Sequence, residues 1–499
     1  MKNIVTRYCI NPDISFPEYD IDTGELVKIH NYDDFCHLIN RWKIILVKKY
    51  NAQPGQTILL GIGPNLYYYS LIFAAAELGL VIIVDWPKPD TEKDLENPKI
   101  SMYGQIDYIV IDANFHKTGH PQAFNEWTIQ RDLRFGRNFL YQHEFYDYEI
   151  TKSPGITDIV KAVWATPDSN LIYTCSSGTT SMPSKIVESH KKVFQMSDRL
   201  INIYFTKNDS ALHYKTVHHG SSMCVHFLPA FMAGGAQFTP EGINGDHKSM
   251  DPVIKFVVDK KINQLFLHTP EMLLYFLKNT PKVSHKVDIT TLQQITPEML
   301  LLMKEKNINC IRSSFGDTTI GGVFFMKTVD QTTPIGEYDV NNMGPVLDDF
   351  YQFEIRNNRL WIAIPSLQQE WRTSNDVFAV VDGNYHFKGR ATAYRINGEW
   401  INLVSLEQIV IQLFGLSDAK SNADIVIDSD QQKVYLAVWV SNNEAENKLK
   451  NYLTDTYNGA VNISYILRNE NRNEFLGSRK IDNSKIRLVC REKLNLLGD

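Results

Sequence analysis

The apolar pattern between residues 57 and 87 is the feature that most constrains the fold of this chain. TILLGIG (57–63) is a short apolar run, NLYYYSLIFAAAELG (65–79) is a longer one, and VIIVDWP (81–87) is a second short run that ends in proline. Runs of these lengths are typical of a buried strand, a buried helix and a second buried strand. DYIVIDA (107–113) predicts a further strand. Strands that alternate with helices favour an α/β architecture built in layers.

The most apolar stretch of the chain, residues 71–86, contains Glu77 and is too short to cross a bilayer. We therefore expect no membrane span there. After residue 190, apolar side chains recur every three or four residues, at Val193, Met196 and Leu200, which predicts an amphipathic helix. Ser189 is placed to cap the start of that helix.

A second region begins near residue 390 and differs in pattern from the first. Residues 400–415 predict a short strand that leads into a helix, and residues 423–440 alternate like two strands with a turn between them. A helix over 444–457 and a strand in NISYILR complete a small α+β domain. A chain of 499 residues is expected to hold two or more domains. We predict a large multi-layer domain of sheets and helices over 1–388, and a small α+β domain over 389–499.

Charge and cysteine content narrow the function classes. The net charge of −6 and the pI near 6.2 do not by themselves indicate a nucleic-acid partner, and they leave a local basic patch as the alternative. The six cysteines are scattered without a CxxC pair, so neither a zinc site nor a disulfide framework is indicated. The start of the chain has no secretory apolar region, and a reducing, cytoplasmic location is the simplest expectation.

The segment YTCSSGTTSMPSKIVESH (173–190) gathers small hydroxyl side chains around Gly178, between two apolar stretches. Glycine lets backbone amides converge and hydroxyls add donors, so such a loop suits phosphate binding. It lacks the GxxxxGK[ST] spacing of a Walker loop, because Pro183 follows Gly178 by five residues. Composition alone leaves a polar surface turn as an equal alternative.

The same segment resembles the phosphate loop of the adenylate-forming superfamily, which includes acyl- and aryl-CoA synthetases, nonribosomal peptide synthetase adenylation domains and luciferase. Further similar segments occur in the family's order along about 450 residues: 64–87 before the loop, and 217–238, 313–322, 371–390, 396–409 and 475–485 after it. The loop departs from the family pattern at two positions. Ser181 replaces a common glycine, and Ser184 stands where the family has lysine, with Lys185 displaced by one residue.

The resemblance implies that a carboxylate attacks the α-phosphate of ATP, which gives an acyl-adenylate and pyrophosphate. It also implies a role for each matching residue. The loop residues Ser177, Gly178, Thr179 and Thr180 would hold the β- and γ-phosphates, with Lys185 either joining them or remaining solvated. The nucleotide site would further include Phe315 against adenine, Gly316 and Thr318 beside it, Asp376 on the ribose hydroxyls, and Arg390. For Phe315, Asp376 and Arg390 the alternative is a structural role.

Lys480 aligns with the mobile catalytic lysine of the family's small domain, where an ammonium can bridge the acyl carboxylate and the α-phosphate. Arg479 is its local rival. His219, with His218 beside it, would line or gate the acyl channel; the alternative is a structural histidine. Thr319 stands where the family has a glutamate that binds Mg²⁺. A hydroxyl is a weaker ligand than a carboxylate, which leaves three readings: Mg²⁺ held by phosphates and waters, help from Asp317, or a weakened relative.

The predicted enzyme is therefore an AMP-forming ligase that uses ATP and Mg²⁺ to activate a small-molecule carboxylic acid. The acceptor is coenzyme A, the phosphopantetheine of a separate carrier protein, or an amine. The sequence leaves the acid, the acceptor and the oligomeric state open. The alternative function is a nucleotide-binding relative that has lost adenylation and serves as an interaction scaffold, motivated by Ser181, Ser184 and Thr319.

Overall fold

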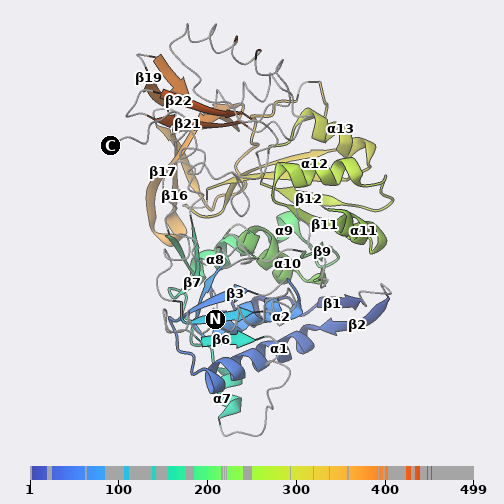
Figure 1. The fold of residues 1–499 in the computed structure, drawn as a ribbon, viewed down its shortest axis with the longest axis vertical. Helices are drawn as coiled ribbons and strands as arrows, with labels where there is room; N and C mark the ends of the chain where they lie inside the picture. Colours follow the sequence, from blue (N-terminus) through green and yellow to red (C-terminus); the bar gives the residue numbers. More distant parts are fainter. Residues whose placement is uncertain are drawn as a thin grey trace. The chain divides into compact units, whose positions relative to one another are not determined.

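The chain divides by its internal contacts into two compact units in a computed structural model (Figure 1). Unit 1 comprises residues 1–293 and 302–333, and unit 2 comprises residues 294–301 and 334–499. The domain boundary that the sequence predicts between residues 388 and 389 remains a prediction. The structure describes residues 3–19, 25–61, 64–84, 106–111, 138–141, 155–175, 185–214, 217, 220, 222–239, 250–292, 294–317, 320–336, 338–356, 359–390, 393–396, 399–402, 423–428, 433–438, 447 and 451.

The first sheet of unit 1 has six strands in the order β6-β5-β3-β4-β7-β8. Adjacent strands of this sheet run parallel, except that β7 and β8 pair antiparallel at one edge. The strands are β3 (Thr57–Gly61), β4 (Val81–Ile83), β5 (Tyr108–Ile111), β6 (Asn138–Tyr141), β7 (Asn170–Cys175) and β8 (Lys185–Ser189).

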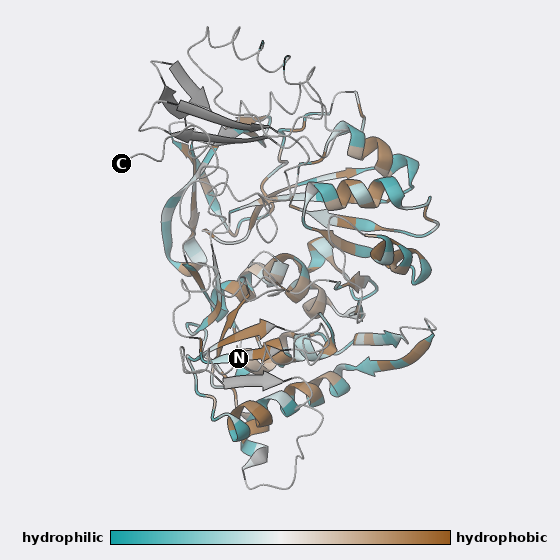
Figure 2. Cartoon of the chain, viewed as in Figure 1, coloured by the Kyte–Doolittle hydropathy of each residue, from teal (hydrophilic) through white to brown (hydrophobic). Residues whose placement is uncertain are grey.

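Helix α2 (Leu66–Glu77) connects β3 to β4 and confirms the strand–helix–strand pattern of the sequence. It begins at Asn65, whose side chain accepts a hydrogen bond from the Tyr68 amide. Every residue from Tyr68 to Glu77 is buried, so the helix lies within the core. Figure 2 shows the preceding strand, β3, as mostly hydrophobic. Helix α1 (Tyr32–Ile44) packs alongside it, and a side chain of Asn31 caps its start.

The second sheet of unit 1 has eight strands in the order β14-β13-β12-β11-β9-β10-β1-β2. The six strands from β13 to β1 run parallel, and an antiparallel strand closes each edge. The strands are β1 (Ile14–Tyr19), β2 (Leu26–Asn31), β9 (Ser210–Leu212), β10 (Gly235–Phe238), β11 (Gln264–Leu267), β12 (Asp288–Thr291), β13 (Cys310–Gly316) and β14 (Val323–Asp330). The carboxyl ends of β9, β11 and β13 therefore meet at one edge of this sheet.

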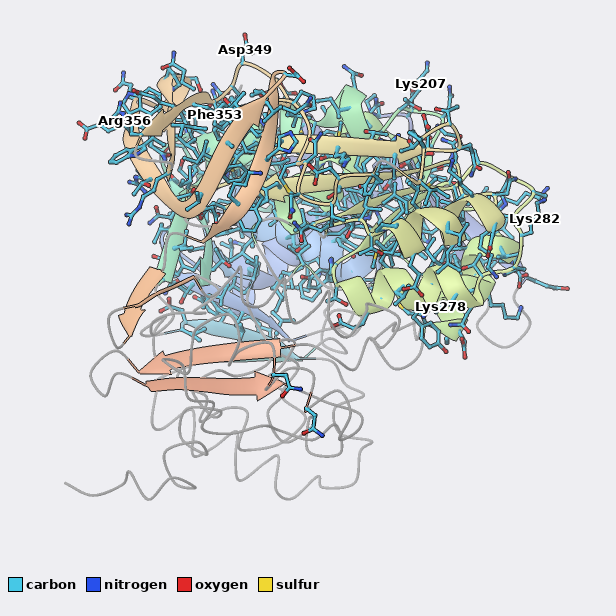
Figure 3. The ribbon with its side chains drawn as sticks, turned by 90° about the horizontal axis from the view of Figure 1, so that it is seen from above. Lys207, Lys278, Lys282, Asp349, Phe353 and Arg356 are labelled. Carbon is cyan, nitrogen blue, oxygen red and sulfur yellow. The ribbon has the colours of Figure 1, made fainter. Side chains whose placement is uncertain are left out.

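The remaining helices are mostly amphipathic. In α12, Leu273, Phe276 and Leu277 are fully buried, whereas Lys278 points outward (Figure 3). The helix expected after residue 190 is confirmed as α8 (His190–Asp198), with Ser189 as its cap. The helices are α7 (Ile156–Lys161), α8, α9 (Ile201–Tyr204), α10 (Leu228–Ala233), α11 (Asp251–Asp259), α12 (Pro270–Asn279) and α13 (Pro297–Glu305). Short 3₁₀ helices lie at Arg7–Cys9 and Pro365–Leu367, and π-helical segments at Ile45–Lys49 and Ser222–Phe227 (η4).

A buried cluster of charges ties the N-terminal segment to α1 and α2. The Glu77 carboxylate lies 2.6 Å from Nη2 of Arg7 and 2.8 Å from Nζ of Lys43. Lys43 also donates to the carbonyl of Val160, 3.0 Å away. Burial opposes ionisation of Glu77, but the hydrogen bonds and charges of Arg7 and Lys43 outweigh it, so its pKa lies below the ordinary value. Glu77, the charged residue inside the most apolar stretch, is thus an ionised centre of the core.

Unit 2 contains an antiparallel four-stranded sheet and two hairpins. On the sheet, Arg356 (labelled in Figure 3) lies about 5 Å from the ring centroids of Trp361 and Trp371, a contact of a cation with two aromatic rings. The second hairpin confirms the two strands expected between 423 and 440. The strands are β15 (Gln352–Arg356), β16 (Arg359–Ile364), β17 (Gln369–Val381), β18 (Asn384–Arg390), β19 (Ala393–Ile396), β20 (Glu399–Asn402), β21 (Ala423–Asp428) and β22 (Lys433–Val438). The helices expected over 400–415 and 444–457 and the strand in NISYILR fall almost wholly outside the described residues.

Among the residues that the structure describes, no helix is both long enough and apolar enough to cross a membrane. Four cysteines in that part of the chain are free thiols: Cys9, Cys36, Cys224 and Cys310.

Candidate active site

The hydroxyl-rich loop connects β7 to β8 at the edge of the six-stranded sheet. Cys175, the last residue of β7, pairs with Lys185, the first of β8, so the two ends of the loop are held together in one ladder. Ser177, Gly178, Thr179 and Thr180 lie outside the described residues. Their phosphate-binding role therefore remains a prediction.

Lys185 is exposed, and its ammonium lies 3.6 Å from the ring centroid of Tyr173. A cation over an aromatic face gains about 0.5–1 kcal/mol at an exposed site. Successive residues of a strand point to opposite faces, so the displacement of this lysine by one residue in sequence changes the face from which it projects. In this structure Lys185 contacts Tyr173; its contact with phosphates remains a prediction.

The motif SSFGDTTIGG begins at the carboxyl end of β13. Phe315 is half-buried and stacks on Phe325 of β14, with ring centroids 6.1 Å apart. Asp317 follows, and its carbonyl accepts a hydrogen bond from the Gly321 amide at 2.7 Å. Thr318 and Thr319 lie between them in the sequence and outside the described residues. The Phe315 ring stacks on Phe325, and its predicted stacking on adenine remains a prediction.

Gly316 occupies a place that no other residue fits. A Cβ added there would lie 2.0 Å from the carbonyl oxygen of Gly322, closer than any real contact. The chain pairs Gly316 with Val323 next to a bulge at Phe315, which brings the two backbones together.

We expect Gly316→Ala to push the β13–β14 connection apart and to lower the rate of acid-dependent AMP formation by about tenfold or more, since a misplacement of 1 Å costs that much in a positioned site. Gly336→Ala is the matched control, because a Cβ at Gly336 meets nothing within 4 Å. Equal activity of the two variants would show that the connection does not position the reaction.

Residues in and next to α8, and in α9, contact the SSFGDTTIGG motif and the strand that follows it. The sequence did not predict these contacts. Lys192 pairs with buried Glu188 at 2.7 Å, and a Cβ at Gly321 would lie 2.7 Å from Cε of that lysine. Farther along, the Arg199 guanidinium donates to the carbonyl of Val323. Glu188 lies in β8 and Lys192 in α8, so the rule for helical residues four apart did not predict this pair.

A third support comes from α9, where the hydroxyl of Tyr204 is hydrogen-bonded to that of Ser314, one residue before Phe315. Both residues are buried. Nothing in the sequence connects these two hydroxyls, which lie 110 residues apart.

His190, which matches the phosphate-loop motif, has a structural neighbour far away in sequence. It is fully buried, and its Nδ1 accepts a hydrogen bond from the amide of Val5 at 3.3 Å. Burial lowers the pKa of His190 to about 4, so the ring is neutral near pH 7. This histidine fastens the N-terminal segment to the start of α8.

Asp376 and Arg390 are brought opposite each other in unit 2. They form a directly paired position of the antiparallel strands β17 and β18. Asp376 is half-buried, and its amide donates to the hydroxyl of Ser374 at 3.3 Å. The side chain of Arg390 lies outside the described atoms. The pairing places a carboxylate residue opposite a guanidinium residue, and their nucleotide-binding role remains a prediction.

His218, His219, Lys480 and Arg479 lie outside the described residues, so their predicted roles are not tested by this structure. Within the described part of the chain, no three histidine, cysteine, aspartate or glutamate side chains form a group that suits a metal ion. Of the residues near Thr319, Asp317 offers the hard oxygen donor that Mg²⁺ prefers.

No protein-family model and no curated protein matches the sequence. Solved structures do match, over nearly the whole chain. McyG A-PCP complexed with phenylalanyl-adenylate has a TM-score of 0.71 at 15% identity, covering 97% of this chain and 94% of that one. A benzoate CoA ligase from Burkholderia xenovorans has a TM-score of 0.67 at 15% identity, covering 94% and 96%. The amide bond synthetase McbA from Marinactinospora thermotolerans has a TM-score of 0.68 at 13% identity, covering 97% and 98%.

These matches show that the chain has the fold of the adenylate-forming enzymes. The fold class expected from the sequence, α/β with more than one sheet and associated helices, is confirmed. At this level of identity the likeness establishes the fold, and the chemistry has to be argued from the residues.

Proposed function

We propose that this protein activates a small-molecule carboxylic acid with ATP, forming an acyl-adenylate and releasing pyrophosphate. The observation that carries the proposal is the shared fold over at least 94% of both chains with McyG A-PCP, whose bound ligand is an aminoacyl-adenylate. The order of the predicted nucleotide residues supports it: the hydroxyl-rich segment stands between β7 and β8 in the sequence, Phe315 and Gly316 end β13, and Asp376 pairs with Arg390 across β17 and β18.

In this proposal the loop Ser177–Thr180 binds the β- and γ-phosphates through amides and hydroxyls. Asp376 accepts hydrogen bonds from the ribose hydroxyls, and Arg390 adds positive charge beside the nucleotide. Lys480 holds the acyl carboxylate against the α-phosphate and screens the repulsion between two anions. Bound Mg²⁺ would neutralise phosphate charge, with Asp317 as the carboxylate closest in sequence to Thr319.

The second half of the reaction passes the acyl group to a thiol or an amine. The solved structures that share the fold include a CoA ligase, a structure with a carrier domain and an amide bond synthetase. We therefore propose a thiol acceptor, coenzyme A or a separate carrier protein's phosphopantetheine, with an amine as the alternative. A cytoplasmic location fits the free thiols of the described region.

The first test is ATP- and acid-dependent formation of AMP and hydroxamate, with hydroxylamine as the acceptor, across fatty, aryl and amino acids. We expect one class of acid to give both products in equal amounts, because each turnover cleaves one ATP and releases one acyl group. ATP binding without AMP formation on any acid would contradict the proposal and favour the nucleotide-binding scaffold.

A further inference from the structure

Helix α8 begins directly after β8, and hydrogen bonds hold its first turn in place. The amide of His190 donates to the carbonyl of Ser169 at 3.0 Å. The amide of Lys191 donates to the carbonyl of Pro167 at 2.8 Å. Both carbonyls belong to the segment just before β7, and the ring of His190 is fully buried. The start of α8 is therefore fixed relative to β7 and β8, the two strands that flank the hydroxyl-rich loop.

An ion pair joins β8 to α8 across this junction. Nζ of Lys192 lies 2.7 Å from Oε2 of Glu188, and the two side chains are 14% and 4% exposed. Little water reaches the pair, so its attraction is weakly screened and each charge keeps the other in place. A buried pair of this kind is weak evidence for stability, since apolar residues of similar size often serve as well. What it does supply is a defined position for the end of the lysine side chain.

The lysine of this pair lies against the backbone of Gly321, in the SSFGDTTIGG motif. A Cβ added at Gly321 would lie 2.7 Å from Cε and 2.8 Å from Nζ of Lys192, and 3.2 Å from Oε1 of Glu188. Gly321 also has a φ of +91°, which residues with a side chain rarely adopt. Its amide donates to the carbonyl of Asp317 at 2.7 Å, so the position of Gly321 affects that of Asp317 as well.

A second cation holds the chain two residues beyond Gly321. The Arg199 guanidinium donates to the carbonyl of Val323, the first residue of β14. Arg199 directly follows α8 with a helical backbone, and it stands seven residues, or about two turns, after Lys192. The two cations therefore project from one face of the helix. Together they contact the chain on both sides of Gly322, where β14 begins.

The π-helical segment η4 lies close to these charges on another side. Its residue Cys224 is buried, and burial raises the pKa of the thiol. The Glu188 carboxylate raises that pKa further, while the cations of Lys192 and Arg199 oppose it. Helix α8 also packs against η4. The three charged side chains are thus surrounded by protein, which restricts their movement.

We propose that Lys192, assisted by Arg199, is a positioning residue of the adenylation reaction: from a helix fixed to β7 and β8, it holds the connection between β13 and β14 in place. The inference rests on the proposed function and deepens it, because that connection includes the predicted nucleotide and metal residues Thr318 and Thr319 and follows Gly316. The predicted phosphate loop and these residues are thereby kept in a fixed relation. Lys192 acts through Gly321 and not by touching the substrate.

The first test is Lys192→Met, which keeps most of the length of the side chain and removes its charge. We expect the Kd for Mg·ATP, measured by isothermal titration calorimetry, to rise about tenfold, as when one hydrogen bond to a charged group is lost. The rate of acid-dependent AMP formation should fall by about tenfold or more, because a misplaced site loses at least that much. Lys191→Met is the matched control, since it makes the same change about 100° around the helix.

A lysine that only stabilised the fold would give a different result. Lys192→Met would then lower the Tm and leave the Kd and the rate of the folded protein equal to those of Lys191→Met, which would overturn the inference. If Lys192→Met does not fold, the double variant Glu188→Gln/Lys192→Met decides, because it leaves no buried charge without its partner. The same rise in Kd is expected there, and an unchanged Kd would contradict the positioning role.

A double-mutant cycle tests the contact with Gly321 itself. Gly321→Ala places a Cβ against the lysine, and Lys192→Ala removes the Cε and Nζ that this Cβ would meet. The strain of a positive φ is present in both backgrounds and cancels. We expect Gly321→Ala to raise the Kd for Mg·ATP by a factor about fivefold larger in the wild-type background than in Lys192→Ala. Effects that simply multiply would show that Lys192 does not act through Gly321.

Binding and turnover together separate this inference from the proposed function. A Kd for Mg·ATP that rises in Lys192→Met and not in Lys191→Met, with no AMP formed from any acid, would support the positioning role and contradict the proposed function. AMP formation at equal rates and equal Kd values in the two variants would support the proposed function and overturn the inference.

Discussion

Glu77→Ala is expected to lower the free energy of unfolding by about 3–5 kcal/mol, because it leaves buried cations without their counter-charge. The side chains of Arg7, Lys43 and Glu77 are at most 9% exposed, so water cannot replace the lost carboxylate. The measurement is urea or thermal unfolding followed by circular dichroism.

Two variants make this result specific. Lys43→Met removes one cation but leaves the Arg7–Glu77 pair, so a smaller loss is expected. Asp259→Asn breaks an exposed ion pair with Lys255, which is worth at most about 0.5 kcal/mol. If Glu77→Ala were no more destabilising than Asp259→Asn, the cluster would contribute nothing to stability. If Glu77→Ala does not fold, the stability lost in Lys43→Met, compared with that lost in Asp259→Asn, still shows whether the cluster stabilises the protein.

The same cluster gives a pH dependence with a definite sign. The folded-state pKa of Glu77 lies below its ordinary value of 4.5. Its contribution is therefore fully present above the unfolded-state pKa and is lost as the pH falls through the folded-state pKa. The stability difference between the wild type and Glu77→Gln should hold from neutral pH down to about pH 5 and shrink below that.

Lys480→Ala is expected to reduce the rate of AMP and hydroxamate formation by about 100- to 1,000-fold, the range found when one charge-stabilising group is removed from an active site. The physical reason is that two anions, the acid and the α-phosphate, must approach each other, and an ammonium between them lowers that barrier. The KM for ATP should change little, because the predicted nucleotide contacts come from other residues.

Arg479 and Lys485 supply the comparison. Arg479 is the adjacent cation and the rival for the same role, and Lys485 is a lysine five residues beyond Lys480. We expect Arg479→Ala and Lys485→Ala to retain most of the activity. A large loss in Arg479→Ala with little loss in Lys480→Ala would transfer the catalytic role to the arginine, and unchanged rates in all three would contradict the mechanism.

Local sequence determined the elements that local forces control. The β3–α2–β4 unit follows from runs of apolar residues with the asparagine cap at residue 65, and the start of α8 follows from Ser189. In each cap a side chain accepts a hydrogen bond from the backbone amide three residues later, so both partners are close together in the sequence. The order of the motifs along the chain also predicted the fold.

Only the tertiary structure decided which distant side chains meet. Glu77 was visible as a charge in an apolar stretch, but its partners lie 70 and 34 residues away, at Arg7 and Lys43. Lys192 was one of two adjacent lysines, and its contact with Gly321 exists only because packing brings α8 beside the β13–β14 connection. Sequence patterns report on neighbours along the chain, whereas burial, pKa shifts and cavities arise from parts of the chain that packing brings together.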